Sequence, residues 1–256
     1  MKTILLAFQL FSVCCLAQIE PDPSFLMQSQ DVPVAGVVLP DIRFRRLAYT
    51  NTTTAVTAIG SSNVTIYANE LVLCMVQNSK AYAPAVPTLA GCGLAWQAIY
   101  TTNFNESATT NQMTVFRCMT NATTPTAAIT ASVAASTGGG MIVCAFTNVD
   151  TSGTYGSGAI VQSAGIGNQV GTACTITLSA LGGSTNSVVA FYIDAINGFG
   201  GTVEAGWTES VDEGYNTPAS GTYLMYRIAT SDNTPTTTIS SDNWSGWAAE
   251  LKVLYP

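Results

Sequence analysis

Three short runs of apolar residues constrain the fold of this chain more than any other feature. They occupy residues 71–76, 141–146 and 188–193, and none of them alternates apolar with polar residues. Runs of this length, rich in Val and Ile, are typical of strands that are covered on both faces. We therefore expect these three segments to be the central strands of β-sheets.

The rest of the chain predicts further strands and no amphipathic helix. Short runs rich in Val, Ile, Thr, Tyr and Phe recur between clusters of Gly, Asn, Ser and Pro, as in sandwiches and barrels. The further strands are expected at residues 44–49, 64–67, 94–100, 113–119, 127–134, 173–178, 202–207, 222–228, 236–239 and 246–254. Together they predict an all-β fold, a two-sheet antiparallel β-sandwich of jelly-roll type.

The beginning of the chain predicts export. Lys2 precedes an apolar stretch that ends in small residues, which indicates a secretory signal peptide over residues 1–17. Residues 18–41 are rich in proline and predict an extended leader, and residues 42–256 predict the β-sandwich domain. Because no later apolar run is long enough to cross a bilayer, we expect a secreted, extracellular protein with no membrane span.

Charge and histidine content exclude several classes of function. The chain has 8 Lys and Arg against 15 Asp and Glu, and it has no His. The cluster of Arg43, Arg45 and Arg46 is too small to follow a polyanion, so we expect no nucleic-acid partner. The lack of His removes the commonest general base, the Ser-His triad and His-ligated metals. With only 9% charged residues, the surface should consist mainly of Thr, Ser, Asn and Gly.

The cysteines beyond the predicted signal peptide are odd in number and would lie in an oxidising compartment. They are Cys74, Cys92, Cys118, Cys144 and Cys174. At least one is therefore unpaired or pairs between chains. Cys74 and Cys144 lie inside apolar runs, where we expect small buried side chains. If 94–100 and 113–119 form a hairpin, Cys92 lies near Cys118, and this pair is the expected disulfide.

Carboxylates suggest two further sites, each with a simpler alternative. A glycosidase needs two carboxylates roughly 5 to 9 Å apart. Glu204 and Glu209 are five positions apart and would lie on opposite faces of one strand. A hydrolase therefore requires loops that bring Asp194 or Asp212 to one of them. Asp150 and Asp212 are also candidate calcium ligands. The alternative is that these acids stabilise turns.

Aromatic residues outside the apolar runs are the stronger functional signal. Sugars have flat C–H faces that stack on aromatic rings, while their hydroxyl groups bond to amides and carboxylates. The predicted ligand-binding residues are Trp207, Tyr215, Phe199, Asp194 and Trp244. Tyr155 and Tyr82 lie in similar loop sequences. For each single ring, packing in the core is the alternative.

Five segments carry a resemblance to a known family. They are 68–73 (ANELVL), 94–96 (LAW), 114–117 (TVFR), 143–153 (VCAFTNVDTSG) and 247–251 (WAAEL). In this order, over most of residues 43–255, they resemble the concanavalin-like or jelly-roll sandwich domains of secreted bacterial and phage surface proteins. The resemblance implies glycan binding or the building of particle surfaces, and it brings no catalytic residues.

These observations lead to three hypotheses. The first is a secreted, non-enzymatic surface protein that binds carbohydrate or mediates adhesion, with a glycan or cell-surface polymer as partner and no cofactor except calcium. The second is a structural protein that self-associates in a coat, fibre or extracellular layer. The third is a histidine-free glycoside hydrolase or lyase, which needs paired carboxylates in a groove.

Overall fold

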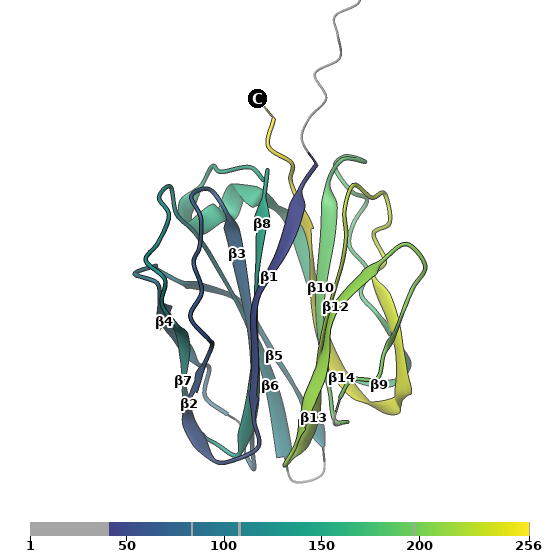
Figure 1. Ribbon diagram of the computed structural model, residues 1–256. Coiled ribbons are helices and arrows are strands. Elements are labelled where there is room, and N and C mark those ends of the chain that lie inside the picture. The colour runs from purple at the N-terminus through teal and green to yellow at the C-terminus, as the bar shows by residue number, and fades with distance from the viewer. Residues whose placement is uncertain (1–40, 83, 107–108, 197, 256) are drawn as a thin grey trace, which may run out of the picture. The chain divides into compact units, whose positions relative to one another are not determined.

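The part of the chain that the structure describes is all-β, and its strands form antiparallel sheets (Figure 1). The computed structural model describes residues 41–255, except 83, 107–108 and 197. The predicted signal peptide lies outside the described residues, as does all of the predicted leader except Asp41. Within the described part, no helix has the length and apolar character needed to span a membrane.

The strands form three sheets. The first sheet has the order β1 (Arg43–Thr52), β8 (Gly138–Thr147), β3 (Leu71–Lys80), β6 (Thr109–Met119) and β5 (Gln97–Glu106). The second has the order β11 (Thr202–Val203), β14 (Thr236–Leu251), β10 (Ser187–Asp194), β13 (Ala219–Arg227) and β12 (Thr208–Asn216), with β9 (Ile160–Thr175) paired to β14. The third has the order β2 (Val56–Gly60), β7 (Ile129–Ser136) and β4 (Thr88–Gly91). A 3-10 helix, η1 (Thr154–Ala159), precedes β9.

The first sheet lies between the other two and is buried on both faces (Figure 1). Successive side chains of a strand point to opposite faces. Leu73 and Met75 of β3 accordingly pack in the first core, with residues such as Trp247 of the second sheet. Val72 and Cys74 pack in the second core, against the third sheet. A third core covers the outer face of the second sheet.

The structure confirms the three predicted central strands. β3 and β8 have hydrogen-bonded neighbours on both sides, and β10 lies between β14 and β13. Every residue of β10 is buried. The all-β antiparallel fold is therefore as the sequence predicts, with a third sheet added to the two that we expected.

Of the third sheet, the sequence predicts only β7, expected at 127–134, because the other two strands carry weak signals. β2 and β4 are short, and several of their side chains are exposed. The strand expected at 64–67 is reduced to an isolated bridge between Val64 and Ala127. In the second sheet, the strands expected at 236–239 and 246–254 are one strand, β14, whose pairing with β9 shifts register three times.

Side-chain bonds connect the first and second sheets along both edges. On the β1 side, Arg46 Nη1 donates to the Ser210 carbonyl oxygen at 2.9 Å, and Asn51 Nδ2 donates to that of Gly214 at 2.6 Å. On the β5 side, Asn243 Nδ2 donates to the Asn105 carbonyl oxygen at 3.3 Å. Each bond provides a side-chain donor for a carbonyl group at the edge of a sheet, which would otherwise have to bond to water.

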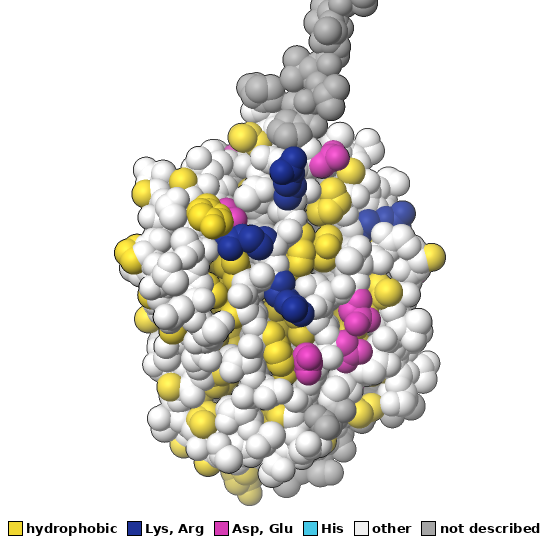
Figure 2. Space-filling model, in the orientation of Figure 1, with side chains coloured by type: hydrophobic (Ala, Val, Ile, Leu, Met, Phe, Trp, Pro, Cys, Tyr) yellow, Lys and Arg dark blue, Asp and Glu magenta, His cyan; other side chains and the backbone are white. Residues whose placement is uncertain are grey.

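The visible surface is largely uncharged, as the composition predicts. Figure 2 shows that white, uncharged atoms dominate this face and that charged side chains gather in small groups. The blue group in the middle lies over β1, the strand that carries Arg43, Arg45 and Arg46. The basic side chains therefore form a short local cluster on this face.

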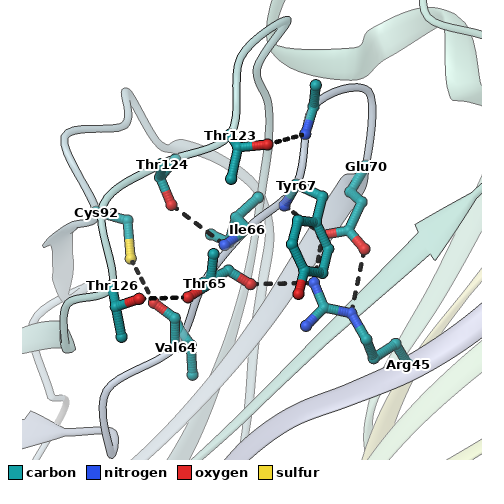
Figure 3. Close-up of polar contacts among 11 residues, drawn as sticks. Arg45, Val64, Thr65, Ile66, Tyr67, Glu70, Cys92, Thr123, Thr124 and Thr126 are labelled. Carbon is teal, nitrogen blue, oxygen red and sulfur yellow. Dashed lines mark hydrogen bonds and ion pairs between the residues drawn. The ribbon is translucent and has the colours of Figure 1, made fainter.

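Arg45 is fully engaged within the fold. Its Nε donates to Glu70 Oε1 at 3.1 Å and its Nη2 to Glu70 Oε2 at 2.5 Å, while the Tyr67 ring lies over the guanidinium at 4.7 Å (Figure 3). A further bond from Nη2 to the Thr65 carbonyl oxygen ties β1 to the segment before β3. The Glu70 side chain is only 1% exposed. The pair is therefore structural.

Replacing Arg45 by Met should lower the free energy of unfolding by about 3 kcal/mol, because it leaves the buried Glu70 carboxylate without its cation. The double variant Arg45→Met with Glu70→Gln should lose less free energy of unfolding than the two single variants together, because it removes the buried carboxylate as well as its cation. Urea unfolding monitored by tryptophan fluorescence measures all three. The exposed Arg43→Met is the control, and a loss for Arg45→Met no larger than the control's would contradict the structural role.

Candidate functional site

The predicted aromatic binding residues are buried, which corrects their assignment. Trp207, Phe199 and Trp244 are 6%, 1% and 3% exposed and pack in the third core. Phe199 stacks on Tyr223 with ring centroids 4.8 Å apart. Trp207 Nε1 donates to Asp232 Oδ2 at 2.9 Å. These rings belong to the packing of the second sheet and present no face to a ligand.

The other two predicted ligand-binding residues are also buried, and both hold the backbone and core in place. The Tyr215 hydroxyl lies 2.6 Å from Ser79 Oγ, between the first and second sheets, and burial raises the pKa of this tyrosine. Asp194 Oδ1 accepts bonds from the backbone N–H groups of Ile196 at 3.1 Å and Gly221 at 3.0 Å. Neither side chain is available for stacking or for binding a ligand at the surface.

The candidate calcium ligands stabilise turns instead. Asp150 accepts from the Ser152 N–H at 2.8 Å and binds Lys252 Nζ at 2.6 Å, so an ammonium group occupies the place a cation would take. Asp212 accepts from the N–H groups of Gly200 and Gly201 at 2.9 and 3.1 Å. Among the described residues, no group of three or more His, Cys, Asp and Glu could hold a metal ion.

The predicted hairpin is confirmed, but the predicted disulfide is wrong. β5 pairs with β6, with Gln97 opposite Arg117. Cys92 and Cys118 are nevertheless free thiols buried in the second core. The Cys92 thiol donates to the backbone carbonyl group of Val64 (Figure 3). It also lies within hydrogen-bond distance of the Ala127 carbonyl oxygen. Burial raises the pKa of the Cys118 thiol, which keeps it protonated.

The two cysteines inside the apolar runs are buried, as the sequence predicts. Cys74 and Cys144 are fully buried, one in the second core and one in the first. Burial raises the pKa of both thiols, so they behave as small apolar side chains.

An open cavity of about 490 Å³ lies where β5 begins and β6 ends. The strands form one wall, and η1 with the first residues of β9 forms the other. Its polar lining residues are Gln97, Arg117, Thr154, Tyr155, Ser157 and Ser163, and its apolar ones are Ala98, Ile99 and Ile160. We call it the Arg117–Tyr155 cavity. A second hollow of about 190 Å³ lies on the other side of Tyr155 and includes Asn69, Thr120 and Asn121 in its lining.

The register of the first sheet positions Arg117. It lies opposite Leu73 of β3 and Gln97 of β5, and directly opposed residues share a face. Since Leu73 belongs to the first core, Arg117 points to the same side, two residues before the end of β6. Its Nε is buried without a hydrogen-bond partner. Burial lowers the pKa of the guanidinium.

A rigid turn positions Tyr155. The residue has a left-handed backbone (φ 54°), which is unfavourable for a bulky side chain, and its side chain is 39% exposed. The neighbouring Gly156 also has positive φ, and a Cβ there would lie 3.0 Å from Leu71 and Met119. The turn therefore packs directly against β3 and β6 and keeps the ring at the cavity.

The C-terminal segment clamps the same turn. The Asp150 N–H donates to the Lys252 carbonyl oxygen at 3.0 Å, and the Lys252 N–H donates to that of Ala159 at 2.9 Å. Within the turn, the Thr154 N–H donates to Ser157 Oγ at 3.1 Å. The cavity wall is thus held by backbone bonds and by the Asp150–Lys252 ion pair.

This arrangement suits binding better than hydrolysis. A flat ring, a guanidinium, an amide and several hydroxyl groups surround the cavity, and no Asp or Glu is among its lining residues. The sequence placed Tyr155 in the wider set of loop aromatics but treated Arg117 only as part of a fold marker. The flanking glycines of Tyr155 were the available signal, because they indicate a turn that can hold a ring outside the core.

No protein-family model matches this chain, and comparison with curated proteins and with solved structures finds no match either. The resemblance to concanavalin-like domains therefore stays a prediction, and the function has to be argued from the cavity itself.

The Asp150–Lys252 pair should make the stability of the turn depend on pH. Its bonds to Lys252 and Ser152 lower the pKa of Asp150 to about 2 from 3.8. The stabilisation that the Asp150 carboxylate provides is therefore complete above about pH 5 and is lost as the pH falls through about 2. The free energy of unfolding of Asp150→Asn should lie below that of the wild type at pH 6 and approach it at pH 2. A difference that does not shrink would contradict this role.

Arg117→Met should raise the free energy of unfolding by about 1 kcal/mol, because it removes a buried donor that has no partner. Met has a similar length and can pack beside Leu73. Chemical denaturation of Arg117→Met next to Arg45→Met provides the comparison, since the second variant should be destabilised. A loss of stability in Arg117→Met would show that the guanidinium has a structural role.

Proposed function

We propose that this protein is a non-enzymatic surface protein that binds carbohydrate in the Arg117–Tyr155 cavity. The single observation that carries the proposal is the Tyr155 ring, which a strained and clamped turn holds beside an open polar cavity. Strain at a bulky residue with positive φ is typical of functional positions. A partly exposed ring of this kind can stack on the C–H face of a sugar.

The rest of the cavity fits a sugar in size and chemistry. Its volume of about 490 Å³ lies within the range of small-ligand sites. Gln97, Ser157 and Ser163 provide an amide and two hydroxyl groups, which can donate to and accept from sugar hydroxyls. The hollow across Tyr155 adds the amides of Asn69 and Asn121. A glycan of more than one unit could therefore pass over the ring.

The hydrolase hypothesis has less support. Asp194 and Asp212, the acids that it needs, accept bonds from backbone N–H groups in turns. Glu209 Oε2 accepts from the Tyr223 hydroxyl at 3.2 Å. A carboxylate pair for general acid and base catalysis would have to face one groove. We therefore propose binding without hydrolysis.

The wider setting of this function is also proposed. The predicted signal peptide supports export, and the antiparallel sheets that pack around the first core are compatible with a jelly-roll type of sandwich. Export and this type of sandwich both fit an adhesion or glycan-binding role outside the cell. The alternative is a structural protein that self-associates. Size-exclusion chromatography of the same sample distinguishes it from a glycan-binding protein.

Tyr155→Asn should abolish glycan binding without loss of stability. Asn tolerates a left-handed backbone, so the variant relieves the strain of the turn while it removes the stacking surface. A glycan array of the purified protein, followed by titration of the strongest hit, measures binding, and thermal unfolding measures stability. Tyr82→Ala is the control, because Tyr82 is 85% exposed and lines neither cavity.

Three outcomes would overturn the proposal. They are a silent array together with a monomeric protein, binding that survives in Tyr155→Asn, and equal loss in Tyr82→Ala. A silent array together with large oligomers would favour the structural alternative.

A further inference from the structure

We infer that the Arg117–Tyr155 cavity takes an acidic sugar, whose carboxylate is bound by the guanidinium of Arg117. This inference rests on the proposed function, which requires only that a sugar binds. It adds the chemical class of the ligand and the residue that selects it.

Arg117 has no carboxylate partner among the described residues, in contrast to three other basic residues. Arg45 pairs with Glu70, Arg227 pairs with Asp232 at 3.0 Å, and Lys252 pairs with Asp150. No ion pair connects Arg117 to a carboxylate of the described residues. In a chain of formal net charge −7, carboxylates are plentiful, but none of those that the structure describes lines the cavity. The positive charge is therefore available to a ligand.

The orientation of the guanidinium fits a carboxylate. Arg117 Nε is buried and has no hydrogen-bond partner among the described residues. The two terminal nitrogens form no hydrogen bond with the described residues, and Arg117 lines the cavity. A planar guanidinium with free terminal donors can bind both oxygens of a carboxylate at once. A neutral sugar hydroxyl can accept such bonds, but it lacks the negative charge that strengthens them.

The stability cost of Arg117 also favours a functional role. A buried donor without a partner is destabilising, and such groups in folded proteins call for an explanation. An apolar side chain at this position could pack beside Leu73 and Ile99, which both lie against the first core. A ligand carboxylate would supply the missing counter-charge. It would also explain why a cation interrupts the otherwise apolar row of Met113, Val115 and Met119.

The cavity supplies the remaining contacts of a sugar acid. Gln97 lies directly opposite Arg117 on β5, and Ser157 and Ser163 lie on the other wall. Tyr155 provides the stacking face. One cation matches one acidic group, in contrast to the rows of cations that a nucleic-acid backbone requires. The site therefore predicts a ligand with a single carboxylate at the bound unit.

The test compares sugars that differ only in charge. Isothermal titration at low salt would use oligogalacturonate and sialyllactose, each against its own methyl ester, with a sulfated galactose oligomer as a further kind of anion. The wild type should bind at least one carboxylated member about tenfold or more tightly than its neutral partner, as charge-assisted hydrogen bonds predict. Binding of this member should weaken as salt is raised.

Variants assign the effect to Arg117. Arg117→Gln should reduce binding of the acid to the level of its neutral partner, and Tyr155→Asn should abolish binding of both. Arg43→Gln is the matched control, because Arg43 is exposed and lies on β1, at the opposite edge of the first sheet from β5. Thermal unfolding of each variant confirms that it is folded.

The outcomes separate the inference from the proposed function. Equal affinity for acidic and neutral sugars would overturn the inference and leave the proposed function standing. A preference for acids that persists in Arg117→Gln, or that is lost equally in Arg43→Gln, would place the selection elsewhere. If the sulfated sugar binds more tightly than the carboxylated sugars, the assignment of a carboxylate as the group bound by Arg117 is overturned. If no sugar of any kind binds, on the array or in titration, the proposed function itself fails.

Discussion

The burial of both faces of the first sheet is the constraint on which the rest of the structure depends. Leu73 and Val72 of β3 are neighbours in sequence, yet they pack in different cores. Each fully buried aliphatic side chain contributes roughly 1.5 to 3 kcal/mol, so leaving either face in water would cost more than a domain of this size can tolerate. The second and third sheets are the covers that this sheet requires.

The cavity forms at the β5 edge of this sheet, between its strands and the segment of η1 and β9. Along β6, Met113 and Val115 lie in the first core, and Arg117 continues the same face. The turn of η1 packs on β3 and β6 and carries Tyr155 at its surface. Gln97 and Arg117 thus stand on strands, and Tyr155 stands on a turn that packs against the same sheet, which preorganises these groups for a ligand.

The strongest sequence signals predicted the fold well and the site poorly. The unalternating runs identified the central strands, and the spacing of 94–100 and 113–119 identified the hairpin. The same spacing suggested a disulfide, but the thiol of Cys92 lies on the carbonyl groups of Val64 and Ala127, which the hairpin does not contain. Trp207 and Phe199 looked exposed beside Gly and Asn, yet remote strands bury them in the third core.

What the sequence alone determined is the kind of structure: strands covered on both faces, few charges at the surface, and chemistry without histidine. These properties follow from local periodicity and composition, which act on every short segment independently. Only the tertiary structure decided which polar and aromatic side chains reach the surface, because accessibility depends on contacts between distant segments. Arg117 and Tyr155 form one site because η1 closes against the end of β6, a contact that no local pattern contains.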